Sequence, residues 1–144
     1  MELSSKEKGN LTELQCITAF YKLGYQVSIP YGENSRYDFI ADVNGKLIRV
    51  QVKTSSIKKD TQGAISFATA STRINSTQNI THRYTKNEID YFATYCVERD
   101  TICLFNIKEM PNSTIRLRYE PAKNGQTNGV RWEKDYLIET VLGE

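Results

Sequence analysis

The chain has 144 residues and a net charge of +2, with 39% hydrophobic and 25% charged residues, which is typical of one soluble globular domain. So small a net charge does not by itself indicate a nucleic-acid-binding protein. The polar amino terminus lacks the apolar core of a signal peptide, and no apolar run is long enough to cross a membrane. We therefore expect a cytoplasmic protein that has no membrane partner. Its odd number of cysteines, set in apolar patterns, predicts buried reduced thiols: Cys16, Cys96 and Cys103.

The first predicted helix covers residues 11–23, where apolar side chains recur at helical spacing. Asn10 or Thr12 is expected to cap its start, and Gly24 is placed to end it in a left-handed conformation. Glu13 lies on the same broad side as the apolar residues. It either belongs to a site at that position or simply complements the helix dipole as a first-turn acid.

Residues 36–54, RYDFIADVNGKLIRVQVKT, predict a β-hairpin around Asn44-Gly45, the strongest short signal for a type I′ turn. With these two residues as the loop, the register places Asp38 opposite Gln51, and Lys53 follows on the same face. The hairpin thus gathers a carboxylate, an amide oxygen and an ammonium at one end. The other face is apolar and is predicted to face the core: Tyr37, Phe39, Ala41, Val43, Ile48, Val50 and Val52.

Two further strands are predicted on either side of the hairpin, at residues 25–29 and 64–70. Residues 71–85 contain few apolar side chains and predict a polar loop. A loop of this length is too long for a simple connector, so it is either functional or mobile.

A second helix is predicted at about residues 86–95, because Thr85 and Glu88 have capping-box spacing before an apolar stripe. Residues 101–107 form a near-continuous apolar run typical of a strand buried on both faces. Together the elements predict a mixed α/β domain with helices packed on a central sheet. The remaining segment predicts a strand at 115–119, a polar loop at 121–129 and a closing helix at 132–142.

Oxygen ligands held across a strand pair, beside a lysine, suit a hard cation such as Mg²⁺. Asp38 would be the anionic ligand, with the Gln51 side-chain carbonyl and the Val52 main-chain carbonyl as further donors. Lys53 could orient or deprotonate an attacking water, or stabilise charge on a phosphate. Glu13 would join them if the first helix packs over this end of the sheet. The alternative is a solvated hairpin face on which these polar groups face water, and a β-bulge would shift the register.

Asp38, a gap of twelve residues and then Gln51-Val52-Lys53 resemble the D…(E/Q)-x-K signature of the PD-(D/E)XK nuclease superfamily. Tyr37 stands where that signature has proline, and Gln51 stands where it usually has an acid. The glutamine form is similar to small homing endonucleases encoded in group I introns of bacteria. The resemblance implies a restriction-endonuclease-like fold, in which a central mixed β-sheet is flanked by helices in the order αβββ(β)αβ.

The resemblance further implies one nuclease domain over residues 1–144, with a core at about 9–107 and a C-terminal appendage at 111–144. Such an enzyme would cut double-stranded DNA at a specific site, using Mg²⁺, for which Mn²⁺ can substitute, and no nucleotide cofactor. Because Gln51 is neutral, Glu13 would supply the second negative charge of the metal site. The implied catalytic residues are Glu13, Asp38, Gln51 and Lys53, and the implied metal ligands are Asp38, Gln51, the Val52 carbonyl and Glu13.

One such domain has one active site, so a double-strand break implies a homo-oligomer, a dimer or a tetramer. The appendage could supply its interface or could simply pack as part of the core. Basic and amide side chains flanking the hairpin are candidate DNA contacts, although each could equally be a solvated surface group: Arg36, Lys58, Lys59, Arg73, Asn75, Gln78, Arg83 and Lys86. A Holliday-junction resolvase, a restriction-type nuclease and an inert DNA-binding module of the same fold stay open as alternatives.

Overall fold

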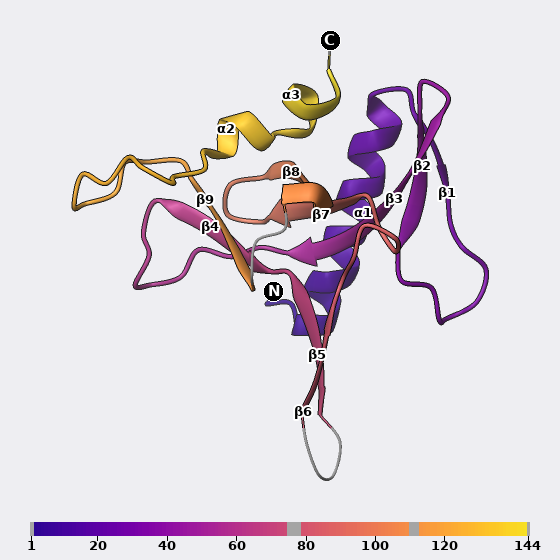
Figure 1. Cartoon of the computed structure of the whole chain (residues 1–144), viewed down its shortest axis with the longest axis horizontal. Coiled ribbons are helices and arrows are strands. Elements are labelled where there is room, and N and C mark those ends of the chain that lie inside the picture. The colour runs from indigo at the N-terminus through magenta and orange to yellow at the C-terminus, as the bar shows by residue number, and fades with distance from the viewer. Residues whose placement is uncertain (1, 75–78, 110–112, 144) are drawn as a thin grey trace.

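The computed structural model describes residues 2–74, 79–109 and 113–143, with the main chain alone for 71–74 and 79–82 (Figure 1). A five-stranded sheet has the order β1-β2-β3-β7-β8, in which β3 and β7 are parallel and the other neighbours antiparallel. The mixed central sheet flanked by helices is confirmed. Its elements are α1 (Ser5–Lys22), β1 (Gln26–Ser28), β2 (Phe39–Val43), β3 (Lys46–Thr54), β7 (Tyr91–Cys96) and β8 (Thr101–Asn106).

Helix α1 begins earlier than predicted, because the capping box that starts it lies further upstream. Ser4 Oγ accepts a hydrogen bond from the Glu7 N–H at 3.2 Å, and the Ser4 N–H donates to Glu7 Oε1 at 2.9 Å. This reciprocal pair satisfies the main-chain donors that a helix start leaves open. The predicted cap at Asn10 or Thr12 is therefore wrong. The predicted left-handed end is confirmed, since Gly24 has a φ of +91°.

The β2–β3 hairpin has the predicted register, which runs from Val43 opposite Lys46 to Phe39 opposite Val50. Both loop residues have the positive φ that a type I′ turn requires, +55° at Asn44 and +90° at Gly45. The Phe39 ring meets Phe20 of α1 edge to face at 5.4 Å. The predicted apolar face packs under α1 through four buried residues: Phe39, Ala41, Ile48 and Val50. Tyr37 is an exception, since it packs against the core on the other face of the sheet.

The predicted second helix at 86–95 is wrong, because residues 91–96 form β7 between β3 and β8. Ile89, Phe92, Ala93 and Cys96 do recur at helical spacing, but the strand is buried on both faces and needs apolar side chains on each. Phe92 and Cys96 join one core, whereas Ala93 and Tyr95 join the other. Thr85 and Glu88 do interact as a capping pair, with the Thr85 N–H donating to Glu88 Oε1 at 3.0 Å, but they close only one turn.

Two short ribbons extend the molecule beside the central sheet. β4 (Ala64–Ala68) pairs antiparallel with β9 (Thr114–Arg118), and β5 (Ala70–Ile74) pairs with β6 (Asn79–Arg83). The β5–β6 ribbon projects away from the rest of the chain (Figure 1). The predicted polar loop at 71–85 is therefore largely a hairpin, because ladder hydrogen bonds join main-chain groups and do not require apolar side chains.

The C-terminal segment covers β8, whose consecutive residues Cys103, Leu104 and Phe105 are buried as predicted. A short 3₁₀ turn, η1 (Ile107–Glu109), follows β8. The predicted closing helix is instead two short helices, α2 (Glu133–Tyr136) and α3 (Ile138–Leu142). Leu137 separates them because its extended main chain, with φ −58° and ψ 142°, forms a β-bridge with Cys103.

The three cysteines are buried free thiols, as predicted. Within residues 2–74, 79–109 and 113–143, no helix combines the length and apolar character needed to cross a membrane.

Candidate active site

Three elements bring the predicted site residues to one end of the sheet. Asp38 directly precedes β2, Gln51 and Lys53 lie on β3, and Glu13 lies on α1. The helix is joined to this end of β3 by a 3.0 Å hydrogen bond between the side-chain oxygens of Thr12 and Thr54. Because Glu13 follows Thr12, this bond holds Glu13 near the end of β3 that carries the polar residues.

Asp38 is held against β3 by two hydrogen bonds. Its main-chain N–H donates to the Val50 carbonyl at 2.8 Å, and its Oδ2 accepts from the Val52 N–H at 2.7 Å. Burial raises the pKa of Asp38, while the Val52 N–H and the Lys53 ammonium act in the opposite direction. Asp38 is therefore an oriented and partly desolvated carboxyl group beside the Gln51-Val52-Lys53 segment.

Glu13 shares this environment with Asp38. Burial raises the pKa of Glu13, and the negative charge of Asp38 raises it further. Two carboxyl groups in one partly desolvated environment, with the half-buried Gln51 on the adjacent strand, make an oxygen donor set suited to a hard divalent cation. The described residues contain no group of three or more His, Cys, Asp or Glu side chains able to hold a metal.

Lys53 completes the group and is partly buried. Burial lowers the pKa of Lys53, the carboxylate of Asp38 raises it, and the guanidinium of Arg36 lowers it. Its Nζ lies 5.0 Å from the centroid of the Tyr84 ring, and Cζ of Arg36 lies 4.4 Å from the same centroid. Tyr84 is not part of the sequence signature. It lies in residues 71–85, the segment predicted to be a polar loop.

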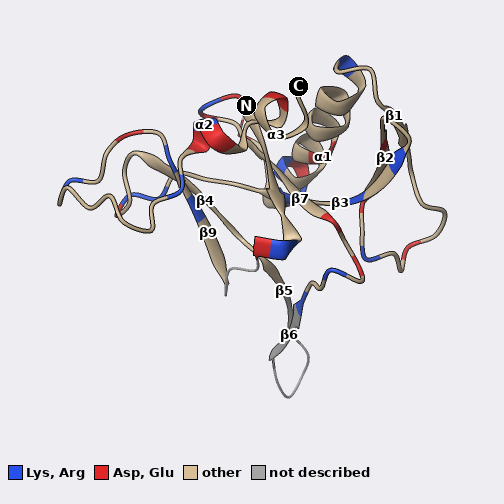
Figure 2. Cartoon of the chain, turned by 45° about the horizontal axis from the view of Figure 1, so that its top comes forward, with Lys and Arg blue, Asp and Glu red and all other residues tan. Residues whose placement is uncertain are grey.

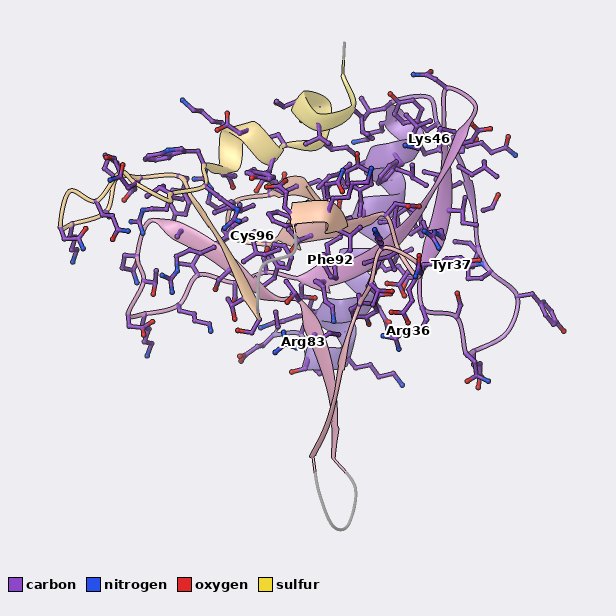
Figure 3. The ribbon with its side chains drawn as sticks, in the orientation of Figure 1. Arg36, Tyr37, Lys46, Arg83, Phe92 and Cys96 are labelled. Carbon is purple, nitrogen blue, oxygen red and sulfur yellow. The ribbon has the colours of Figure 1, made fainter. Side chains whose placement is uncertain are left out.

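The predicted DNA-binding residues have different surroundings. Arg36 is engaged within the chain, since its Nε lies 3.0 Å from Glu88 Oε2. In Figure 3, Arg36 and Arg83 lie toward the β5–β6 ribbon, whereas Lys46 lies at the far tip of the β2–β3 hairpin. Figure 2 shows Lys and Arg interspersed with Asp and Glu along the chain as a whole. Lys58, Lys59, Arg83 and Lys86 are exposed, the side chain of Arg73 is not described, and Asn75 and Gln78 lie outside the described residues.

A family model described as PD-(D/E)XK endonuclease matches residues 3–139 of the chain. The chain belongs to the PD-(D/E)XK endonuclease family. It is therefore a nuclease, as the sequence signature predicted.

The chain is also similar to the solved structure of a bacterial homing endonuclease, I-Ssp6803I. The TM-score is 0.81 and the sequence identity 27%, over 97% of this chain and 93% of that one. This likeness confirms the restriction-endonuclease-like fold. No curated protein sequence gives a significant match.

For a PD-(D/E)XK endonuclease, the unusual feature of this site is its distribution of charge. The β3 strand contributes a neutral amide at Gln51 and a cation at Lys53, so both negative charges come from residues outside that strand. Asp38 comes from the start of β2 and Glu13 from α1. In such an arrangement Glu13 and Asp38 would be the anionic ligands of a cation, and Lys53 would supply an amine for a water or a phosphate.

Proposed function

We propose that this chain is a Mg²⁺-dependent, site-specific DNA endonuclease of the homing type, encoded in a group I intron, which makes a double-strand break. One observation carries the proposal: the Asp38 carboxylate, just before β2, acts on the pKa of both Glu13 of α1 and Lys53 of β3. Perturbed groups that converge in this way are typical of functional sites. The likeness to a bacterial homing endonuclease supports the choice of substrate and of biological role.

The proposed roles follow from the charge of each group. Glu13 and Asp38 would bind the cation, with the Gln51 amide oxygen and the Val52 carbonyl as neutral ligands. A bound Mg²⁺ would lower the pKa of a water and offset charge on the scissile phosphate. Lys53 would accept the proton of the attacking water or stabilise the phosphate. Its lowered pKa favours proton transfer, because partial desolvation leaves the amine closer to neutrality.

The proposed partner is double-stranded DNA, which Lys58, Lys59, Arg73, Arg83 and Lys86 would contact through phosphates and Asn75 and Gln78 through base edges. Arg36 belongs to this proposed set as well. Because one nuclease domain over residues 1–144 has one site, cutting both strands would require a dimer or a tetramer, with residues 111–144 as the candidate interface.

The test is cleavage of a plasmid that carries the joined exon sequence of the host gene. In Mg²⁺ or Mn²⁺ the wild type should linearise the plasmid, and EDTA should abolish cleavage. Lys53→Ala should lower the single-turnover rate about 100-fold or more, the range typical of a lost acid–base group. Lys46→Ala is the matched control, because Lys46 is an exposed lysine at the other end of β3, and its rate should equal that of the wild type.

Other outcomes would redirect the assignment. Cleavage of four-way junctions without cleavage of linear duplex would favour a resolvase. If wild type and Lys53→Ala bound DNA alike and neither cut it, the chain would be an inert DNA-binding module. An unchanged rate in Lys53→Ala would remove Lys53 from the reaction.

A further inference from the structure

Tyr84 occupies a position that the nuclease signature does not account for. It directly follows β6, is only 7% exposed, and packs edge to face against Phe92 of β7 at 5.6 Å and 89°. Two cations, Arg36 and Lys53, lie over its ring at 4.4 and 5.0 Å from the centroid. An aromatic face attracts a cation at such distances, since the ring quadrupole places negative charge on the face.

The segment that carries Tyr84 is fastened to the strand that carries Lys53. Arg49 of β3 donates from Nη1 to the Asn87 carbonyl at 2.5 Å and from Nη2 to the Lys86 carbonyl at 2.9 Å. The Arg49 guanidinium also pairs with the Asp90 carboxylate, with both contacts at 3.1 Å. Because Arg49 and Lys53 belong to one strand, the turn at residues 85–90 keeps a fixed position relative to Lys53.

Arg36, which comes from the segment before β2, is held over the same ring. Its Nε lies 3.0 Å from Glu88 Oε2, while Glu88 Oε1 accepts from the Thr85 N–H at 3.0 Å and the Thr85 hydroxyl at 3.2 Å. Glu88 thus joins Arg36 to the turn that directly follows Tyr84. A guanidinium fixed at this ring also limits where the Lys53 ammonium can lie, because the two positive charges repel each other.

We propose that Tyr84 is a positioning residue, whose ring holds the Lys53 ammonium beside Asp38. The inference rests on the proposed nuclease function of Lys53. Lysine has a flexible four-carbon side chain and makes no planar, bidentate contacts of its own. A buried ring face that is fastened to β3 restricts this side chain before DNA arrives, and such preorganisation accelerates the chemical step and leaves DNA affinity unchanged.

The proposal separates rate from binding. Tyr84→Phe keeps the ring and should keep the single-turnover cleavage rate. Tyr84→Leu keeps apolar bulk without the ring face, and should lower the rate roughly tenfold while the dissociation constant for DNA changes less than about twofold. Tyr119→Leu is the matched control, because Tyr119 also carries a cation, Arg99 at 3.8 Å, and this pair includes neither Lys53 nor Arg36. It should leave both quantities unchanged.

A graded series addresses the case in which Tyr84→Leu fails to fold. Phenylalanines with increasing numbers of ring fluorines at position 84 keep the ring shape and progressively weaken its negative face. The cleavage rate should fall stepwise along the series, with thermal unfolding measured for each protein. A flat series would overturn the positioning role.

An NMR readout is independent of cleavage. The ε-methylene protons of Lys53, assigned by their absence in Lys53→Arg, should be shifted upfield by the ring in wild type and Tyr84→Phe but not in Tyr84→Leu. A lost shift with an unchanged rate would overturn the positioning role and leave the nuclease function standing. A wild type that shows the shift but cuts no DNA would overturn the nuclease function, and the positioning role with it.

Discussion

The ion pair between Arg99 and Glu133 joins the C-terminal helices to the central sheet. Arg99 Nε and Nη2 donate to the two Glu133 carboxylate oxygens at 3.1 and 2.6 Å, and the Thr101 hydroxyl donates at 2.8 Å. The Glu133 side chain is 6% exposed and that of Arg99 is 33% exposed. Burial by itself raises the pKa of Glu133, but these hydrogen bonds together hold it below its usual value of 4.5.

Arg99→Met should destabilise the protein substantially, because it leaves a buried carboxylate with one hydrogen-bond donor. Breaking a buried pair by removing one partner costs about 3–5 kcal/mol, and the partial exposure of Arg99 places the expected loss near the lower end, about 3 kcal/mol. For a chain of this size that corresponds to a fall in Tm of roughly 6–12 °C. The double variant Arg99→Met/Glu133→Leu should recover most of the loss, since apolar replacement of both partners is often neutral.

The measurement is urea unfolding followed by the fluorescence of Trp132, the only tryptophan, across a range of pH. A carboxyl group whose pKa is lowered in the folded state stabilises the fold above its unfolded pKa, and this contribution disappears as pH falls through the folded pKa. The difference between wild type and Arg99→Met should therefore be largest near neutrality and should shrink below about pH 4.5. A loss under about 1 kcal/mol, or a difference that does not depend on pH, would refute this account.

Two further predictions concern the hairpin and the site. Gly45→Ala should lower the free energy of unfolding by about 1–2 kcal/mol, since Gly45 has a φ of +90°. The control Gly9→Ala within α1 should raise it by about 0.5–1 kcal/mol. Chemical denaturation measures both changes, and equal effects would contradict the turn assignment. Glu13→Gln should stop cleavage yet stabilise the metal-free protein at pH 7 by up to about 1 kcal/mol, because burial and Asp38 raise the pKa of Glu13 and disfavour its ionised form. That gain should vanish below the unfolded pKa of Glu13. A variant as stable as wild type at every pH would argue against burial and the Asp38 charge acting on Glu13.

Much of the hairpin and part of the site could be predicted from the sequence, because both depend on residues close together in the chain. An Asn-Gly loop and a period of two are sufficient to determine the register, and the register brings Asp38 close to the Gln51-Val52-Lys53 segment. The buried strand β8 was likewise predicted from its run of apolar residues. The start of α1 was also encoded locally in Ser4 and Glu7, although the prediction placed it at Asn10 or Thr12.

The β7 strand shows where local patterns become ambiguous. Its apolar residues fit a helix, and the capping pair before it is real, but the segment lies between β3 and β8 and is buried on both faces. A strand buried on both faces shows no period of two, so periodicity alone cannot distinguish it from a helix. The packing of distant elements decided its conformation.

The sequence by itself determined the chemistry of the hairpin, namely one acid, one amide and one lysine within a single local pairing. Only the tertiary structure decided what lies around the hairpin: it brings Glu13 of α1, which the resemblance had implied, near Asp38, and it places the Tyr84 ring beside Lys53. Contacts within a hairpin follow from main-chain register, which neighbouring residues specify. The positions of Glu13 and Tyr84 relative to the hairpin depend on how apolar surfaces far apart in the chain pack against the same sheet, and no local spacing records that.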